Sequence, residues 1–256
     1  MQSRISSDLL KGGFKLESVN IKDVIILASF LLTNIVRNND LKIISTQKTN
    51  LTPFNSKTIP KISIESYLER LAQKTDLNAD VIILAIVLLI RCKSRTLAIK
   101  DENKVQNECS VEYPNEIQFF SSTYSSAESY TAFHSLITSE NPLYSGFFIN
   151  SYNIHRILLT TITIAQKISS DFFYKNSCYA KVGGISTTEL NFLEMEILFI
   201  LKFNLYVTKS EQTNIGTAIL RKYIESQYPN PLKTIRLISS GTFKKADSKS
   251  KEIFTF

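Results

Sequence analysis

The longest apolar run of the chain, VIILAIVLLI from Val81 to Ile90, restricts the possible folds most. A helix formed by ten consecutive apolar residues has no polar face for water, so it must lie in the centre of a bundle. The run has only half of the roughly 20 residues that a membrane-spanning helix requires. We therefore expect a buried helix and no membrane segment.

Further apolar residues recur at helical spacing in the first part of the chain, and helix breakers are few, with Gly 7 and Pro 6. A helix is predicted from about Glu17 to Arg37, ended by the polar residues 38–40. The next one begins at Ser63, a favourable N-cap that follows Pro60. The pattern indicates an all-α fold.

The second part of the chain continues this pattern. A helix is predicted after Asn153 as its cap, and another after Ser186, which has Glu189 three residues later as in a capping box. The pair Gly183-Gly184 is expected to supply positive φ angles between these two helices. Phe203, Leu205 and Val207 alternate as in an extended exit, and residues 210–227 form one more helix candidate.

Charge and cysteine content restrict the possible partners and the compartment. The formal net charge is +7, but the lysines are spread thinly and no groove-reading motif occurs, so nucleic acid is an unlikely partner. Cys92, Cys109 and Cys178 have neither zinc spacing nor a disulfide pattern, which predicts no metal site and reduced thiols. The first residues lack the apolar core of a secretory signal, so we expect a cytoplasmic or nuclear protein.

Two opposite charges, Lys167 and Glu194, interrupt otherwise apolar helical segments. A buried charge costs free energy unless it is paired or used, so both are candidate functional residues. They lie among several short motifs whose order and spacing are distinctive, namely YLERL (67–71), NIHR (153–156), AQK (165–167), YAKVGG (179–184) and ELNFLE (189–194).

In these motifs the chain resembles the cyclin box, and in particular the P-type cyclins of the fungal phosphate-response type. The resemblance covers about 53–207. It implies a cyclin fold with a single five-helix cyclin box at 53–208, which carries a polar insertion at about 96–141. An N-terminal helix and linker (1–52) precede this box, and a partly disordered C-terminal extension (209–256) follows it.

The resemblance also implies a function, that of a eukaryotic regulatory subunit without catalytic activity or cofactor of its own. Such a subunit binds and activates a cyclin-dependent protein kinase and contributes to the choice of substrates. Lys167 and Glu194 match the family's Lys–Glu pair that contacts the kinase. Their charged ends can hydrogen-bond backbone groups of the loop before the kinase's regulatory helix.

Two further residues are candidate kinase contacts. Arg70 matches the arginine of the first box helix, which usually pairs with an Asp late in the second helix. Ile90 occupies that second position here, so either Arg70 finds another acceptor or the second helix aligns differently. Asp171 either binds a kinase arginine, in place of an activation-loop phosphate, or is a solvated aspartate at a helix end.

Other functions have less support in the sequence. His155-Arg156 is followed by Ile157 rather than the aspartate of a kinase catalytic loop, and no glycine-rich nucleotide loop occurs. We expect His155 to form a hydrogen bond within the box. An adaptor with a cyclin fold but no kinase activation remains an alternative, as does a basic cyclin-like factor that binds nucleic acid, for which a second repeat would be expected.

Overall fold

The computed structural model describes residues 4–46, 52–102 and 148–227. For 43–46 and 93–102 the description covers the backbone alone. Over these residues the chain forms eight helices and no strand, which confirms the predicted all-α class. The helices are α1 (Ser7–Gly12), α2 (Ile21–Thr46), α3 (Ile64–Thr75), α4 (Ala79–Glu102), α6 (Ile154–Ser169), α7 (Asn176–Gly183), α8 (Thr187–Ile200) and α9 (Lys209–Gln227).

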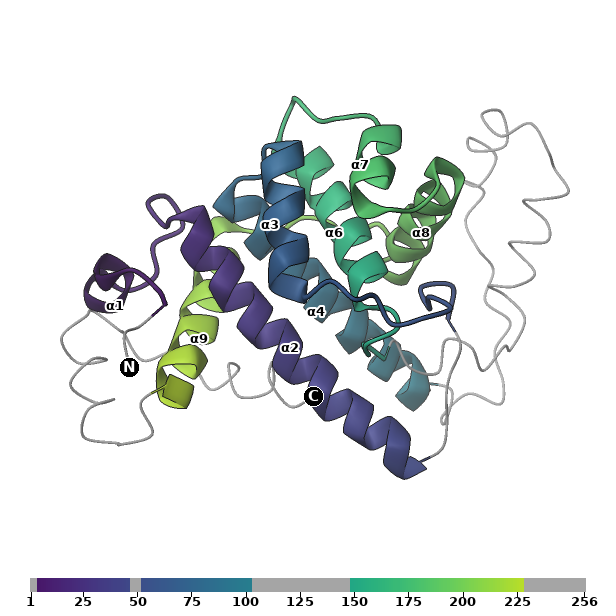
Figure 1. Cartoon of the computed structure of the whole chain (residues 1–256), viewed down its shortest axis with the longest axis horizontal. Helices are drawn as coiled ribbons and strands as arrows, with labels where there is room; N and C mark the ends of the chain where they lie inside the picture. The colour runs from purple at the N-terminus through teal and green to yellow at the C-terminus, as the bar shows by residue number, and fades with distance from the viewer. Residues whose placement is uncertain (1–3, 47–51, 103–147, 228–256) are drawn as a thin grey trace, which may run out of the picture.

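Helix α4 is the centre of the bundle. It contacts α2, α6, α8 and α9, and the residues from Val81 to Leu89 are all buried (Figure 1). The apolar run therefore lies where its lack of a polar face predicts.

The central helix continues well beyond the apolar run from which it was predicted. Helix α4 continues to Glu102, so the insertion predicted at about 96–141 begins within the helix, and residues 103–147 lie outside the described chain. Arg91 is consequently a mid-helix residue, and its partner is Glu211 in α9.

Helix α2 also extends beyond its predicted end, to Thr46 rather than to Arg37. The polar residues that suggested a stop face the segment that leads into α6. The Asn39 side-chain amide donates to the Ile149 carbonyl (2.8 Å), and Asp40 accepts from the Ser151 backbone N–H (3.1 Å). These residues satisfy a distant backbone segment instead of capping their own helix.

Helices α3 and α8 begin where their local signals predict. The Ser63 hydroxyl accepts from the Ser66 N–H (3.1 Å), and the Ser186 hydroxyl accepts from the Glu189 N–H (3.1 Å). Each bond satisfies one of the free N–H groups of a first helical turn. Asn153 occupies the N-cap position of α6, but its side chain bonds residues of the preceding turn instead.

Helix α7 was not predicted, because its eight residues lie in a segment that reads as a polar connector. The expectation for the diglycine after it is half right. Gly184 has a positive φ of 77° at the end of α7. Gly183 is helical, and a Cβ there would lie 2.2 Å from Leu159 Cδ2, so this glycine permits close packing of α7 on α6.

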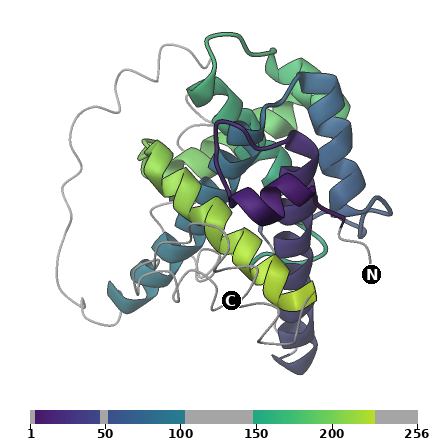
Figure 2. The ribbon, with the colours of Figure 1, turned by 90° about the vertical axis from the view of Figure 1, so that its left-hand side faces the viewer.

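Helix α9 confirms the predicted helix at 210–227 and packs on α2 and α4 (Figure 2). Ile219, Leu220 and Ile224 are fully buried in the same core as α4. The division of the chain at residue 208 stays a prediction. The expected extended exit before α9 begins with a turn instead, because Lys202 and Phe203 adopt left-handed φ angles of 50° and 54°.

None of the helices within the described ranges combines the length and the apolarity that crossing a membrane would require.

Candidate functional site

The structure brings Lys167 and Glu194 together. Lys167 lies in the last turn of α6 and Glu194 in the middle of α8, and Lys167 Nζ is 2.6 Å from Glu194 Oε1. Residues 154–166 of α6 are buried except Arg156, and Lys167 is the position at which the helix emerges from the core. A cation at a helix C-terminus is favoured by the helix dipole.

A third helix joins this pair. The Asn176 side-chain amide donates to Glu194 Oε2 (2.6 Å) and to Asn191 Oδ1 (2.8 Å). We call Lys167, Asn176, Asn191 and Glu194 the Lys167–Glu194 cluster. It fixes the start of α7, the end of α6 and the middle of α8 relative to each other.

The cluster is accessible to a partner. The side chains of Lys167 and Glu194 are 29% and 13% exposed, so both charges reach the surface without being fully solvated. Lys167 has three donors and carboxylate oxygens accept more than one bond each, so both groups can bind a further partner. In this half-buried position such bonds are stronger than they would be in open water.

Asp171 lies four residues beyond Lys167, in the connector 170–175 between α6 and α7. Its side chain is exposed and forms no ion pair with any described residue. Three consecutive aromatic residues, Phe172, Phe173 and Tyr174, follow it, and all three are exposed. No role was predicted for these aromatics from the sequence, although three in a row in a polar connector are a usable signal.

Arg70 is not part of the Lys167–Glu194 cluster in the contacts described. It lies on the exposed side of α3 and forms no ion pair within the described ranges. Ile90 stands where an aspartate was expected as its acceptor, and no other described carboxylate takes over that role. Arg70 is close enough to Tyr67 to oppose, in part, the rise in the pKa of Tyr67 that burial causes. The Tyr67 hydroxyl donates to the Gly183 carbonyl (3.4 Å) and so links α3 to α7.

His155 is a structural residue, as predicted. Its Nε2 lies 3.0 Å from the Ile62 carbonyl, and its ring meets the Tyr67 ring edge-on. Burial lowers the pKa of His155, because the core disfavours the charged imidazolium.

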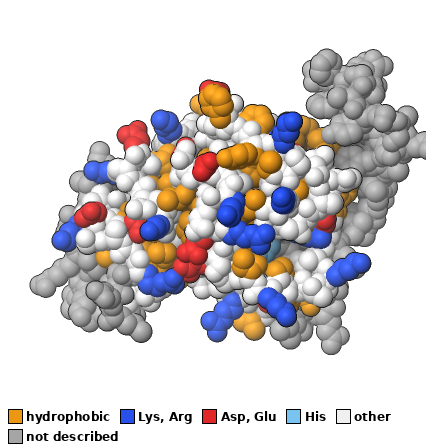
Figure 3. All heavy atoms as spheres, turned by 45° about the horizontal axis from the view of Figure 1, so that its top comes forward, with side chains coloured by type: hydrophobic (Ala, Val, Ile, Leu, Met, Phe, Trp, Pro, Cys, Tyr) orange, Lys and Arg blue, Asp and Glu red, His pale blue; other side chains and the backbone are white. Residues whose placement is uncertain are grey.

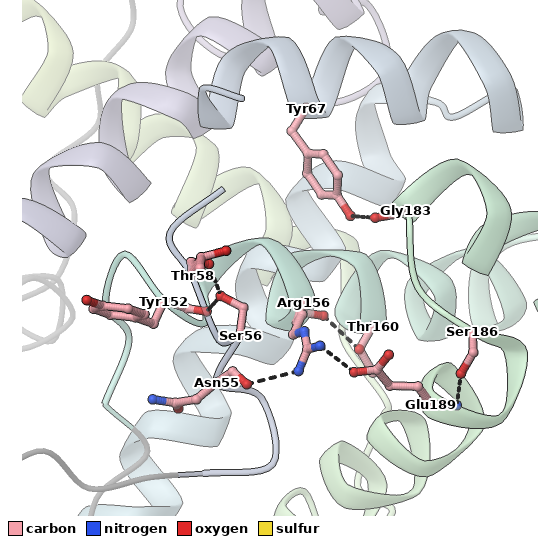
Figure 4. Close-up of polar contacts among 10 residues, drawn as sticks. All are labelled: Asn55, Ser56, Thr58, Tyr67, Tyr152, Arg156, Thr160, Gly183, Ser186 and Glu189. Atoms are coloured by element: carbon pink, nitrogen blue, oxygen red, sulfur yellow. Dashed lines mark hydrogen bonds and ion pairs between the residues drawn. The ribbon is translucent and has the colours of Figure 1, made fainter. Parts of the chain in front are cut away.

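A second ion pair on the same two helices was also missed. Arg156 of α6 binds Glu189 of α8 and donates to the Asn55 carbonyl (3.0 Å), which fastens the segment before α3 to the bundle (Figure 4). Ser56 strengthens this attachment by donating to the Tyr152 carbonyl. The Glu189 carboxylate thus binds a neighbouring helix, and of the predicted capping box the structure shows the bond from the Glu189 N–H to the Ser186 hydroxyl.

Within the described residues, no group of His, Cys, Asp and Glu side chains is arranged to hold a metal ion.

Comparison with known proteins identifies the family of the chain. The model of the cyclin family matches residues 22–205, which include α2 to α8 and the whole Lys167–Glu194 cluster. The chain belongs to the cyclin family. Of the described helices of this cyclin, α3, α4, α6, α7 and α8 lie within the predicted box at 53–208, whose bounds stay a prediction.

The relatives of this cyclin include P-type proteins, which confirms the predicted resemblance. It is 31% identical over 186 residues to Cyclin-U4-1 of Arabidopsis thaliana, covering 72% of this chain and 68% of that protein. It is 31% identical over 209 residues to PHO85 cyclin-7 of Saccharomyces cerevisiae, covering 78% of this chain and 60% of that protein. With PHO85 cyclin-like protein psl1 of Schizosaccharomyces pombe it shares 28% identity over 243 residues, which is 90% of this chain and 81% of the relative. The chain thus spans less than two thirds of the length of the budding-yeast relative.

Proposed function

We propose that this cyclin is the regulatory subunit of a cyclin-dependent protein kinase such as PHO85, and that it activates that kinase. The observation that carries the proposal is the accessible Lys167–Glu194 pair, set between α6 and α8 at the positions that match the family's kinase contact. Relatives named as PHO85 cyclins support this class of partner.

The pair suits the recognition of a peptide backbone. A lysine ammonium donates to carbonyl groups and a carboxylate accepts from N–H groups, so the two together can bind a loop through its main chain. Asn176 keeps the Glu194 carboxylate in place before a partner arrives. A preorganised site loses less conformational entropy when it binds.

Activation follows if the kinase element that binds here is mobile. A cyclin that binds the active arrangement of the kinase's regulatory helix more tightly than the inactive one shifts the kinase toward the active state. The kinase's own Lys–Glu pair and its metal-binding Asp are then in position for phosphoryl transfer. The cyclin supplies no catalytic group to this reaction.

Asp171 is proposed as a second kinase contact. It is exposed, without an ion pair in the described part of the chain, and close in sequence to Lys167. Its carboxylate can bind a kinase arginine and so supply the charge that an activation-loop phosphate provides elsewhere. If the cyclin carrying Asp171→Asn activates the kinase as well as the natural chain does, this role is wrong.

Arg70 remains a proposed contact on the strength of the family match alone. Its guanidinium is exposed on α3 and available to an acceptor on the kinase or on a substrate. Arg70→Ala is expected to weaken kinase or substrate binding without a change in the unfolding temperature.

We further propose that the complex acts in the cytoplasm or nucleus of a eukaryotic cell and that the cyclin contributes to substrate choice. Fusion of the full chain to a fluorescent protein tests the compartment. Comparison of the substrates phosphorylated with and without the cyclin tests its part in selection.

The decisive experiment is affinity purification of the full chain from its own cells, identification of the kinase by mass spectrometry, and assay of its activity. Lys167→Glu should abolish both the recovery and the activation of the kinase, because it places a second carboxylate beside Glu194 where an ion pair stood. Lys22→Glu is the matched control, since Lys22 is an exposed lysine on α2 and the charge change is the same. Recovery of no active kinase with the natural chain would refute the proposal and favour an adaptor without kinase activation. Recovery of an active kinase with Lys167→Glu would instead show that the Lys167–Glu194 pair is not the kinase contact.

A further inference from the structure

The connector 170–175 exposes an unusual amount of aromatic surface. It crosses the top of the molecule between α6 and α7 in Figure 1, and Figure 3 shows hydrophobic side chains protruding from that face. Phe172 is 89% exposed, and Phe173 beside it is also exposed. Single exposed apolar residues are common, but clustered aromatic side chains on a surface mark sites of protein interaction.

Hydrogen bonds hold this connector in place at both of its ends. At the first end, the Ser170 N–H donates to the Gln166 carbonyl of α6 (3.1 Å), and the Ser170 hydroxyl closes a local turn with the Phe172 carbonyl (2.8 Å) and the Phe172 N–H (3.2 Å). At the second end, the Tyr174 hydroxyl donates to Asp76 Oδ2 (2.8 Å), and the Tyr174 ring meets the Tyr179 ring edge-on. The aromatic side chains therefore project from a backbone that is anchored on both sides.

Asp76 is well placed as the second anchor. It ends α3 in the left-handed conformation (φ 46°), with its N–H bonded to the Ala72 carbonyl, so its position is set by the helix terminus. Its carboxylate raises the pKa of Tyr174, because the hydrogen bond requires the protonated hydroxyl. Tyr174 thus remains a donor at physiological pH.

The anchored connector belongs to the same surface as the Lys167–Glu194 cluster. Phe172 follows Lys167 by five residues, and Asp171 lies between them. Asn176, which holds Glu194, directly follows the connector. A partner that binds the cluster through its main chain would therefore meet the aromatic side chains next.

We propose that Phe172 and Phe173 form the apolar anchor that the kinase subunit buries, and that Tyr174, through Asp76, is a positioning residue that holds them outward before the kinase binds. The proposal rests on the proposed function, and its occupant is the kinase that binds the Lys167–Glu194 cluster. Aromatic anchors commonly carry most of the affinity of an interface. A fixed connector spares the complex the entropy of ordering it.

Phe172→Ser tests the anchor. Its dissociation constant for the kinase recovered with the full chain should rise about 10- to 30-fold, a typical loss for an interface hot spot. The unfolding temperature should not fall, because the side chain is almost fully exposed in the free cyclin. Tyr206→Ser is the matched control, since Tyr206 is 79% exposed in the connector before α9 and should change the dissociation constant less than about twofold. Unaltered kinase affinity with Phe172→Ser would overturn the anchor.

A double-mutant cycle tests the positioning role. Tyr174→Phe keeps the ring and removes the hydroxyl, while Asp76→Gly removes the carboxylate and suits the left-handed helix end. Each should weaken kinase binding about two- to tenfold, and the double variant should be no weaker than either single variant. Hydrogen exchange of the amides in 170–175 of the free cyclin should become faster in all three.

The outcomes separate the two proposals. If Lys167→Glu abolishes kinase binding while Phe172→Ser and Tyr174→Phe leave it intact, the aromatic anchor is wrong and the kinase function stands. If the natural chain recovers no kinase, the proposed function itself fails, and if Lys167→Glu leaves binding intact, the Lys167–Glu194 pair is not the contact. Additive losses from Tyr174→Phe and Asp76→Gly would show that the hydrogen bond does not position the connector.

Discussion

Two ion pairs of similar geometry lie in different parts of this cyclin. Lys167 and Glu194 are 2.6 Å apart between α6 and α8, and Arg91 and Glu211 are 2.7 Å apart between α4 and α9. Their side chains are 29% and 13% exposed in the first pair, and 24% and 37% exposed in the second. Distance and burial alone do not distinguish them.

Their surroundings do distinguish them. The Arg91 guanidinium also donates to the carbonyls of Tyr206 (2.8 Å) and Asn204 (3.4 Å), so it fastens the connector before α9 to the core. The Lys167 ammonium has one described partner and adjoins the exposed connector 170–175. An ion pair whose cation directs its hydrogen bonds to groups within the fold contributes to stability. An ion pair whose cation keeps unbonded donors beside an exposed apolar surface can contribute to binding.

The free energy of unfolding provides the first tests of this contrast. Leu220→Ala should lower it most, by about 2–5 kcal/mol, because Leu220 is fully buried where α9 meets the core. Chemical unfolding followed by circular dichroism measures the change. The exposed Leu41 of α2 is the control, since Leu41→Ala should cost less than about 0.5 kcal/mol. A loss below about 1 kcal/mol for Leu220→Ala would mean that α9 contributes little to the core.

Arg91→Met should have the next largest effect on unfolding, about 1–2 kcal/mol. It removes the pair with Glu211 and the hydrogen bonds to two backbone carbonyls, but water replaces part of what is lost at this half-exposed position. Kinase affinity should change less than about twofold. A large loss of kinase affinity with Arg91→Met would erase the distinction between the two pairs.

Lys167→Met should show the opposite balance. We expect it to lower the free energy of unfolding by at most about 1 kcal/mol, as for other accessible ion pairs, since Asn176 still binds Glu194. Kinase affinity, measured by calorimetry or surface plasmon resonance, should fall at least about tenfold. If this variant instead loses more stability than Arg91→Met and binds the kinase normally, Lys167 is a structural residue.

The smallest expected effect is a dependence of stability on pH. Burial lowers the pKa of His155, so the unfolded chain binds a proton more readily than the folded one. The contribution of the neutral histidine is complete above the unfolded pKa of about 6.5 and is lost as the pH falls below that value. At pH 6 the loss should be less than about 1 kcal/mol, and His155→Gln should remove this part of the pH dependence. If the stability of the natural chain and of the His155→Gln variant depends on pH in the same way, His155 does not cause this pH dependence.

Local signals in the sequence located several helices correctly. Ser63 and Ser186 mark helix starts because a hydroxyl that accepts from an N–H three residues later acts within one turn. The apolar run from Val81 identified the central helix because its burial requires no knowledge of its neighbours. Such features depend on residues close together in the chain.

The errors arose where distant residues decide the outcome. Asn39 and Asp40 were interpreted as a helix stop, but they bind Ile149 and Ser151, more than 100 residues away. Helix α7 was missed because its eight residues are stabilised by packing on α3, α6 and α8 rather than by a strong periodicity of their own. The three aromatics after Asp171 gained meaning only once Tyr174 was found bonded to Asp76.

The amino-acid sequence by itself determined the helical class, the central helix and the identity of the two candidate charges, because periodicity, capping and motif order are local properties of a chain. Only the tertiary structure decided that Lys167 and Glu194 meet and that Arg91 binds Glu211 in α9. It also decided that the aromatic connector is anchored to α3. Side chains 27 to 120 residues apart are brought within hydrogen-bonding distance by the packing of helices around α4, and no local pattern records that distance.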